Sequence, residues 1–379
     1  MSKWDTVRLG DVVRIQQTTR AFGGDRVWQL NLDMIEQNTG KIIDYYYTNV
    51  SKGSIIAFDE EHVLYSKLRP NLNKVVCPNG LGTATSELLP LLPNKAFIIK
   101  EYLAVYLRSP YFVNWAVSKT TGAKMPRLSP KELMNKLIPL PPLETQRQIA
   151  ANLDKVTHTI DLCNAILEKL DLLVKSRFVE MFGDPIDNPN GYPQKKYGEL
   201  FELNAGGTPS KSKPEYWENG TISWIGSNMC QNTIIYENDG KYITQEGYDN
   251  SSAKMFPIDT VLIALVGATI GKTALLKFET STNQNVLGVR GISKAGYNPL
   301  FVYYYTQFLH SHFMNIGDGG FNMASKGFVS ELMIYDVNIT EQNRFAAFAE
   351  QTDKSKLAVK QVLEKAETLK KALMQEYFG

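Results

Sequence analysis

Residues 136–160 read KLIPLPPLETQRQIAANLDKVTHTI, a stretch that sets a proline-rich stop directly before a run of strong helix formers. The prolines at 139, 141 and 142 disfavour helix before them, because each ring restricts the preceding residue and removes a backbone donor. Beyond Pro142 the apolar residues recur with helical spacing. The stretch therefore predicts a domain boundary followed by a long helix.

The predicted helix runs from Glu144 to Phe182, where Gly183 can adopt the left-handed cap conformation and Pro185 prevents continuation. Its apolar residues alternate in steps of four and three, the pattern of a coiled-coil seam. These seam residues are Ile149, Leu153, Val156, Ile160, Cys163, Leu167, Leu170 and Val174. At about 1.5 Å per residue the helix is a rod of roughly 57 Å. A rod with one apolar stripe requires a partner.

The partner lies in the same chain. ILEKLDLLVKSRFVEMFG at 166–183 matches VLEKAETLKKALMQEYFG at 362–379 without a gap, and the same alignment places Gln146 on Gln342. The second helix has the expected seam residues Phe345, Val359, Val362, Ala366, Leu369 and Leu373. We interpret this match as a tandem duplication and expect the two helices to pack antiparallel along their seams.

The segments before the two helices, here called the first head and the second head, are also comparable although they diverge. VLYSKLRPNLNKVV at 63–76 resembles VLIALVGATIGKTALL at 261–276, since each reads as a strand, a short polar turn with a lysine, and another apolar run. The predicted fold class is α+β: two α/β domains separated by two long helices packed as an antiparallel coiled coil, a pseudo-twofold tandem repeat. The predicted limits are 1–143, 144–183, 184–340 and 341–379.

Charge is distributed unevenly over these segments. The formal net charge of the chain is +2, and it divides into +6 for 1–143, −1 for 144–183, −4 for 184–340 and +1 for 341–379. The first head therefore has the electrostatic character of a polyanion binder, whereas the second would need a local basic patch on an acidic body.

Compartment and membrane association were judged from the N-terminus, the apolar runs and the cysteines. MSKWDTVRLGDVV has no signal-peptide core, and the longest apolar run, VLIALVGA, is too short to span a bilayer. Cys77, Cys163 and Cys230 are few, odd in number and widely separated. These features predict a cytoplasmic protein that is not associated with a membrane.

The residues carry no recognisable catalytic constellation. The four histidines, His62, His158, His310 and His312, form no HExxH pattern, and no cysteine pair has metal-ligand spacing. GATIGKT at 267–273 resembles a phosphate-binding P-loop but encloses three residues between its glycines, where that motif needs four. We interpret it as a turn at a domain surface, and predict that the chain performs no chemistry itself.

These motifs together resemble the specificity subunit of type I restriction-modification systems. The resemblance rests on IPLPPLETQRQIAANLDKV with the long helix after it, on LEKAETLKKALMQEYFG, and on VLYSKLRPNLNKV, GGTPSKSKPEYWENGTISWI and ALVGATIGKTALL in the heads. It covers essentially the whole chain. One departure is VNITEQNRFAAFAEQ before the second helix, which lacks the prolines of the first boundary.

The resemblance implies a non-catalytic subunit that recognises double-stranded DNA. Each head would be a target-recognition domain for one half of a bipartite, asymmetric site, and the helices would set the spacer and dock the partners. Those partners would be two methyltransferase subunits and two restriction subunits. The resemblance implies no cofactor in this chain, while the partners are expected to use S-adenosylmethionine, ATP and Mg.

Candidate DNA-contacting residues follow from the polar turns of the heads, because arginine and lysine can pair with phosphate or guanine and asparagine can read adenine. In the first head they are Lys67, Arg69, Asn71, Lys74, Lys124 and Arg127. In the second head they are Thr208, Ser210, Lys211, Lys213, Thr269, Lys272, Asn322 and Lys326. Without the resemblance, ordinary solvated turns would be the better interpretation.

Two alternatives from other functional classes remain open. The chain could be a coiled-coil scaffold with two protein-binding heads and no direct DNA readout, which the acidic second head would permit. It could also be a P-loop-like enzyme, which predicts ATP binding that depends on Lys272.

Overall fold

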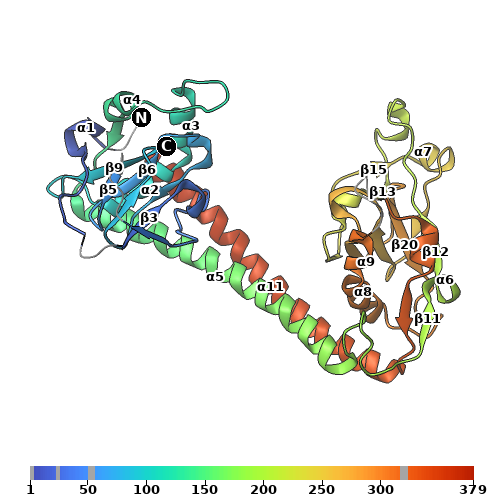
Figure 1. The fold of residues 1–379 in the computed structure, drawn as a ribbon. Coiled ribbons are helices and arrows are strands. Elements are labelled where there is room, and N and C mark those ends of the chain that lie inside the picture. The colour runs from blue at the N-terminus through green and yellow to red at the C-terminus, as the bar shows by residue number, and fades with distance from the viewer. Residues whose placement is uncertain (1–3, 23–25, 50–55, 316–322) are drawn as a thin grey trace. The chain divides into compact units, whose positions relative to one another are not determined.

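The computed structural model describes residues 4–22, 26–49, 56–315 and 323–379 (Figure 1). The chain divides into two compact units: unit 1 is Met1–Ala165 with Lys360–Gly379, and unit 2 is Ile166–Val359. Each unit contains one head and part of each of the two long helices, α5 (Leu143–Phe182) and α11 (Ile339–Phe378).

The predicted fold class is confirmed, since two α/β heads alternate with two long helices that pack on each other. Each unit joins the N-terminal part of one long helix to the C-terminal part of the other, which is the arrangement of an antiparallel pair. The helices begin at Leu143 and Ile339, close to the predicted starts. The compact units follow a different division from the four predicted segments, because each long helix contributes to both.

The first head is built on two four-stranded sheets and a two-stranded ladder. The sheet orders are β2-β9-β6-β7 and β4-β3-β8-β5, and β1 pairs antiparallel with β10. The strands are β1 (Thr6–Arg8), β2 (Val13–Ile15), β3 (Arg26–Leu30), β4 (Tyr46–Asn49), β5 (Ile56–Phe58), β6 (Val63–Ser66), β7 (Val75–Val76), β8 (Gly82–Ala84), β9 (Leu88–Pro93) and β10 (Leu137–Pro139). The helical segments are α1 (Leu9–Val12), η1 (Leu32–Met34), η2 (Pro70–Leu72), α2 (Lys100–Arg108), α3 (Pro110–Ser118) and α4 (Pro130–Asn135).

The second head repeats this plan with one more strand in its larger sheet. The orders are β12-β20-β17-β18-β14 and β15-β13-β19-β16, and β11 pairs antiparallel with β21. The strands are β11 (Gln194–Lys196), β12 (Glu202–Ala205), β13 (Ile222–Ile225), β14 (Thr233–Ile235), β15 (Tyr242–Ile243), β16 (Met255–Phe256), β17 (Val261–Ala264), β18 (Thr273–Leu276), β19 (Thr280–Thr282), β20 (Val286–Arg290) and β21 (Met333–Tyr335). The helical segments are α6 (Tyr197–Leu200), η3 (Pro214–Tyr216), η4 (Ser227–Met229), α7 (Gln245–Asp249), η5 (Gly267–Thr269), α8 (Pro299–Phe308), α9 (His310–Met314) and α10 (Lys326–Ser330).

A buried glutamine joins each head to the helix that follows it. The side chain of Gln146 accepts the backbone N–H of Ile99 at 3.0 Å and donates to the carbonyls of Phe97 and Pro141, both at 2.8 Å. Gln342 makes the matching bonds: it accepts from the N–H of Asn298 at 2.9 Å and donates to a carbonyl five residues before it at 2.7 Å. The residues that donate to the glutamines cap helices α2 and α8. The repeat thus preserves the junction between head and helix.

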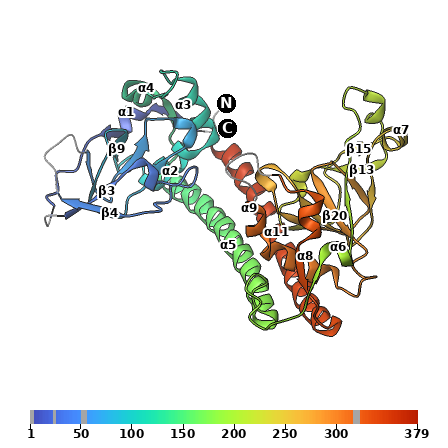
Figure 2. The same cartoon turned by 45° about the vertical axis from the view of Figure 1, so that its right-hand side comes forward.

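The C-terminal end of each long helix completes the core of the other head. Phe182, near the end of α5, packs against Phe301 of α8 with ring centroids 5.1 Å apart. Phe378, its counterpart at the end of α11, packs against Tyr102 and Tyr106 of α2 at 5.9 and 5.5 Å. The ribbon in Figure 2 shows the C-terminal end of α11 beside the first head. Unit 1 is therefore assembled from segments that lie far apart in the sequence, whereas unit 2 is one continuous stretch.

The starts of the two long helices are set by different local signals. Strand β10 ends at Pro139, and the first bond of α5 runs from the N–H of Gln146 to the carbonyl of Pro142 at 3.0 Å. The second boundary has no prolines, and there the side chain of Asn338 accepts the N–H of Thr340 at 2.8 Å. An asparagine at this place replaces the proline stop, because its side chain satisfies a backbone donor that the first turn leaves without a partner. At the other end of α5, Gly183 has a φ of 77° and caps the helix as predicted.

All the predicted seam residues of α5, and four of the six predicted for α11, have buried or half-buried side chains. The buried seam residues are Ile149, Leu153, Cys163, Val174, Phe345 and Ala366, and the half-buried ones are Val156, Ile160, Leu167, Leu170, Val359 and Leu373. None of the helices in the described ranges combines the length and apolar character that a bilayer crossing requires.

Two seam assignments differ from the structure. Val362 and Leu369 are 50% and 49% exposed, and the seam passes through their neighbours Leu363 and Lys370 instead. The less exposed positions along α11 are Thr352, Lys356, Val359, Leu363, Ala366, Lys370 and Leu373, which keep the alternation of four and three. Polar residues at three of these positions conceal the register from a search that accepts only apolar side chains. The repeat itself pairs Leu363 with the seam residue Leu167.

We predict that Gln146→Ala destabilises unit 1. The substitution leaves one buried N–H and two carbonyls without their partner, which costs about 2 to 3 kcal/mol. Unfolding in urea should therefore begin at lower denaturant concentration. The matched control is Gln148→Ala, which changes an exposed glutamine of the same helix and should leave the curve in place. Equal midpoints for both variants would contradict a role for Gln146 in the junction.

Candidate nucleic-acid interface

Two segments of the first head that were predicted separately lie side by side. The turn after β6, residues 67–74, runs next to residues 121–128. The N–H of Leu128 donates to the carbonyl of Lys67 at 2.9 Å, and the N–H of Arg69 donates to the carbonyl of Pro126 at 2.8 Å. The backbone thus joins both predicted groups of basic residues into one double loop.

Four of the six candidate side chains in this double loop are available to a ligand. Arg69, Asn71 and Lys124 are exposed and Lys67 is half-buried. Within the described part of the chain, their side chains make no hydrogen bond or ion pair. The double loop therefore presents three cations and one amide that the fold itself does not use.

The other two candidates are engaged by the fold. The Arg127 guanidinium binds the Glu87 carboxylate through Nε at 3.1 Å and Nη2 at 2.9 Å. This hydrogen bond raises the pKa of Arg127. The ammonium group of Lys74 donates to the carbonyl of Leu32 at 2.5 Å. Both side chains therefore hold the double loop in place, and a DNA contact by either remains a prediction.

The second head forms the corresponding double loop after β17. The N–H of Ala324 donates to the carbonyl of Leu265 at 2.8 Å, and Val266 forms an isolated bridge with Met323. Lys272 takes the place of Lys74 and donates to Oε1 of Gln231 at 2.8 Å. Thr269 is half-buried in the turn. Asn322 lies outside the described residues.

The turn of this loop is not built to wrap a phosphate. The N–H groups of Ile270, Gly271 and Lys272 donate to carbonyls of the same segment at 3.1, 2.8 and 2.9 Å. A P-loop directs such groups at its ligand and leads into a helix, whereas this turn leads into strand β18. The P-loop-like alternative therefore lacks the donors that it needs.

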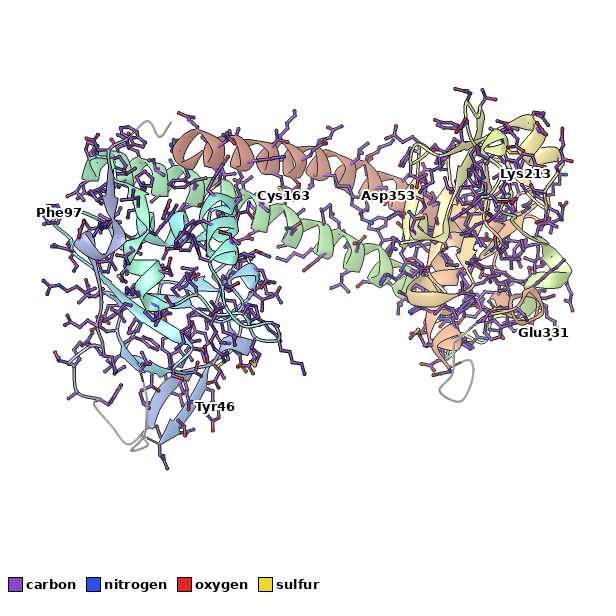
Figure 3. All side chains as sticks on the ribbon, turned by 90° about the horizontal axis from the view of Figure 1, so that it is seen from above. Tyr46, Phe97, Cys163, Lys213, Glu331 and Asp353 are labelled. Atoms are coloured by element: carbon purple, nitrogen blue, oxygen red, sulfur yellow. The ribbon has the colours of Figure 1, made fainter. Side chains whose placement is uncertain are left out.

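A third polar loop of the second head, residues 206–213, is tied to its own surroundings. Thr208 Oγ1 donates to Gln284 at 2.5 Å, Ser210 and Ser212 share a 2.8 Å hydrogen bond, and Lys213 donates to Tyr216 Oη at 2.8 Å. Lys211 is exposed, and its side chain makes no hydrogen bond or ion pair in the described part of the chain. Lys211 is therefore the one cation of this loop that the described part of the fold leaves free. Its neighbour Lys213, labelled in Figure 3, marks the place of the loop.

Lys326 lies apart from that loop, at the first turn of α10. It is exposed and borders a shallow groove with Glu202, Asn204 and Ser330. Its N-terminal neighbour Ser325 caps α10 by accepting the N–H of Phe328 at 3.0 Å. Lys326 follows the second double loop closely in sequence, since Ala324, two residues earlier, belongs to that loop.

Exposed tyrosines are a feature that the sequence predictions missed. Tyr46 and Tyr47 on strand β4 are 51% and 49% exposed, and Tyr242 on strand β15 is 43% exposed. Tyr46 is labelled in Figure 3. These strands are corresponding sheet edges of the two heads. The run DYYYT at 44–48 was the available signal, since alternation in a strand cannot bury three successive aromatic side chains on one face. Exposed aromatic rings are suited to stacking on bases or on a protein partner.

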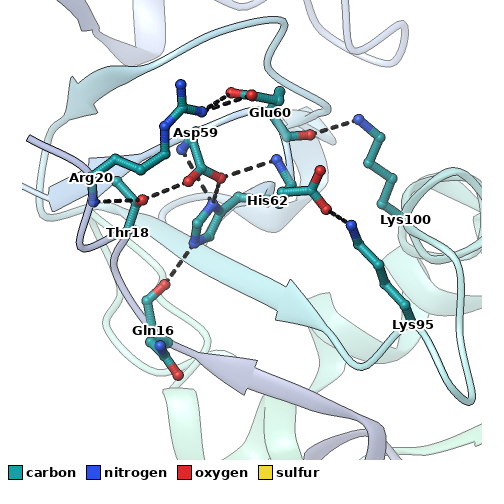
Figure 4. A network of polar contacts seen from close by, with 9 residues as sticks. Gln16, Thr18, Arg20, Asp59, Glu60, His62, Lys95 and Lys100 are labelled. Carbon is teal, nitrogen blue, oxygen red and sulfur yellow. Dashed lines mark hydrogen bonds and ion pairs between the residues drawn. The ribbon is translucent and has the colours of Figure 1, made fainter. Parts of the chain in front are cut away.

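The polar cluster around His62 in the first head has the residue types of a catalytic triad but not the geometry (Figure 4). Thr18 Oγ1 donates to Asp59 Oδ2 at 2.5 Å, and His62 binds Asp59 Oδ1 through Nδ1 at 2.8 Å. His62 Nε2 contacts the carbonyl of Gln16 at 2.9 Å. The hydroxyl therefore binds the carboxylate instead of the imidazole, which is the wrong order for nucleophile activation. The cluster holds residues 16–20 against the turn before β6.

Comparison with known proteins identifies a family and a fold. A family model described as the type I restriction modification DNA specificity domain matches residues 1–172 and 189–368. The specificity subunit of the Escherichia coli type I restriction enzyme EcoR124I/EcoR124II is 24% identical over 288 residues, which cover 74% of this chain and 69% of that protein. A putative specificity subunit of the MjaX enzyme of Methanocaldococcus jannaschii is 24% identical over 282 residues, covering 69% and 63%.

Solved structures extend the similarity to the whole chain. The S subunit of a type I restriction-modification system from M. genitalium is similar with a TM-score of 0.64 at 12% identity, over 100% of this chain and 96% of that one. A chain from a structural study of complex assembly and conformational transition in a type I system gives a TM-score of 0.56 at 19% identity, over 99% and 97%. At these identities the similarity concerns the fold.

We predict that the contribution of Asp59 to stability depends on pH. Burial raises the pKa of this carboxyl, but hydrogen bonds from Thr18 and from the Glu61 N–H, with the contact to His62, lower it further, so that it lies below the ordinary value. Its stabilising effect is therefore complete above the ordinary aspartate range and is lost as pH falls through the lowered pKa.

The measurement is the melting temperature of wild type and of Asp59→Asn at pH 7 and pH 3. The variant should melt lower at pH 7, by the equivalent of about 1 to 2 kcal/mol, and the gap should narrow at pH 3. Asp33→Asn changes an exposed aspartate of the same head and serves as the control. A gap that stays constant with pH would show that the Asp59 charge is not the stabilising group.

Proposed function

This chain belongs to the family of type I restriction-modification specificity subunits, and we propose that each of its heads reads one half of a bipartite, asymmetric DNA site. The observation that carries this proposal is the pair of double loops. They occupy the same place in the same fold, yet one offers Arg69 and Asn71 where the other offers Gly267 and Thr269. Equal scaffolds with different contact groups are what two different half-sites require.

Phosphate contacts would account for much of the affinity. Lys67 and Lys124 in the first head, and Lys211 and Lys326 in the second, are cations that the described part of the fold leaves unpaired. Lysine binds phosphate as a point charge and carries little sequence information, so these residues would position the heads. The +6 charge of residues 1–143 would make the first head the stronger electrostatic contributor.

The long helices would measure the spacer between the half-sites and dock the methyltransferase subunits. We define the outward stripe as Ile166 and Leu173 on α5 with Val362 and Leu369 on α11, which the repeat pairs one to one. Leu173 and Leu369 are 48% and 49% exposed. Leucine at an exposed helical position that the duplication repeats favours a partner that binds twice. Two methyltransferase subunits would meet that condition.

Catalysis would reside in those partners. Methylation of an adenine in each half-site would be performed by the methyltransferase subunits with S-adenosylmethionine. Two restriction subunits that use ATP and Mg would complete the nuclease. This chain would supply the sequence information from the cytoplasm, where such a complex meets its DNA.

The modular reading predicts that the heads can be exchanged independently. Replacing residues 184–340 with the corresponding head of another family member should change one half-site of the methylated motif and leave the other intact, because the two heads belong to separate cores and the helix ends that complete the second core stay in place. Methylation-aware sequencing of a genome exposed to the assembled methyltransferase gives the motif directly. If both half-sites changed together, the heads would not be separate readers. If no motif were methylated by an assembled complex and DNA binding were independent of salt, the scaffold alternative would be supported.

A second prediction concerns the outward stripe. Leu173→Asp and Leu369→Asp should each weaken assembly with the methyltransferase subunit, since a carboxylate cannot be buried unpaired in an apolar interface. Leu357→Asp is the matched control, because Leu357 is an equally exposed leucine (51%) of α11 on another side of the helix. Co-purification and analytical ultracentrifugation measure assembly, and circular dichroism checks the fold. Loss of assembly in all three variants alike would place the partner elsewhere.

A further inference from the structure

One residue of the first double loop has a backbone conformation that its side chain does not favour. Arg69 lies in the left-handed region, with φ 48° and ψ 65°. The other non-glycine residues with positive φ in the described ranges are asparagine or aspartate: Asn38, Asn73, Asn188, Asn219, Asn232 and Asp259. Asparagine and aspartate tolerate this region because their short side chains bond locally, whereas arginine gains nothing of that kind. Arg69 is therefore the one residue with positive φ in the described ranges that is neither glycine, asparagine nor aspartate.

The surrounding backbone holds Arg69 in this conformation. Its N–H donates to Pro126 at 2.8 Å, and its carbonyl accepts the N–H of Leu72 at 2.9 Å. Pro70 follows directly and disfavours the right-handed helical region at the residue before it. Asn73, also left-handed, closes the turn. The direction in which the Arg69 side chain leaves the backbone is therefore set by several independent constraints.

The second head shows that the fold does not need an arginine here. Gly267 occupies the corresponding position, at the start of η5, with a φ of 71°. A Cβ added at Gly267 would meet no atom within 4 Å among the described residues. Within that part of the chain the position is open, and glycine adopts its positive φ without strain. In the first head the strain is retained although the exposed guanidinium binds no group in the described part of the chain.

We propose that Arg69 reads a base edge in the half-site of the first head. This inference rests on the function proposed above. Strain that the surrounding structure maintains is typical of groups that must be pre-positioned. A phosphate contact does not require it, because Lys67 and Lys124, which have long side chains in ordinary backbone conformations, can supply phosphate contacts from the same double loop. The guanidinium fork matches the two acceptors of guanine in the major groove, a contact that requires a fixed direction.

The proposal also assigns a difference between the heads. Gly267 places bare backbone where the first head places a guanidinium, so the second head has no equivalent reader at this position. The two half-sites would therefore differ at the base that Arg69 contacts. The contact belongs to the first head alone.

The test uses Arg69→Gly and Arg69→Lys in the assembled methyltransferase. Arg69→Gly removes the reader and the strain together, so the melting temperature should stay level or rise by about 1 to 3 °C. Affinity for the cognate site should fall by about 5- to 150-fold, and one position of the first half-site should become relaxed in the methylated motif. Arg69→Lys keeps the charge and should relax the same position.

The second half-site is the internal control, and it should stay unchanged in both variants. Lys124→Ala provides the comparison for a phosphate contact, with uniform weakening across sequences and a salt slope lower by about one. The same uniform pattern for Arg69→Gly would overturn the proposal, as would unchanged affinity and motif. A wild-type complex without sequence-specific binding would refute the proposed function itself, which separates the two failures.

Discussion

The buried amide of a glutamine at the first turn of each long helix fixes how each head sits on the helix that follows it. Gln146 accepts the backbone N–H of the residue that caps α2, at 3.0 Å, and Gln342 accepts that of the residue that caps α8, at 2.9 Å. An amide buried this far from water must have its partners satisfied, or the cost falls on the whole junction.

The second constraint is that each head is completed by a helix end outside it, which is distant in the sequence for the first head and adjacent for the second. The aromatic ring of Phe378 enters the core of the first head, and Phe182 enters that of the second. The helix pair also carries charge at seam positions: Lys356 binds Asp171 at 2.7 Å and Asp353 at 3.2 Å. A polar seam residue reduces stability relative to an apolar one, but it favours the single register in which its partners are in reach. The duplication thus yields an antiparallel pair with a defined register.

This arrangement separates what must stay constant from what must vary. The glutamine junctions, the terminal phenylalanines and the outward stripe recur in both repeats. The first two serve packing, and the outward stripe is the surface that we propose for assembly. The double loops recur as backbone but differ in side chains, and Arg69 against Gly267 is the sharpest difference. Lys74 and Lys272 illustrate the intermediate case, because both recur and both donate to the chain segment that follows strand β3 or its counterpart β13, each the second strand in the order of its four-stranded sheet. A basic residue in such a loop is therefore not by itself a DNA contact.

The sequence by itself determined the helix limits, the duplication and the fold class, because helical periodicity, proline and glycine signals and an ungapped repeat are local properties. It also singled out the turns that form the double loops. It did not determine that residues 67–74 and 121–128 form one surface, that Arg127 is taken by Glu87, or that the α11 seam runs through Leu363. Each of these depends on which groups meet across tens of residues, and Lys356 and Lys370 concealed the seam from an apolar pattern. The left-handed conformation of Arg69 likewise exists only because Pro126 and Leu72 bind its backbone in the folded chain.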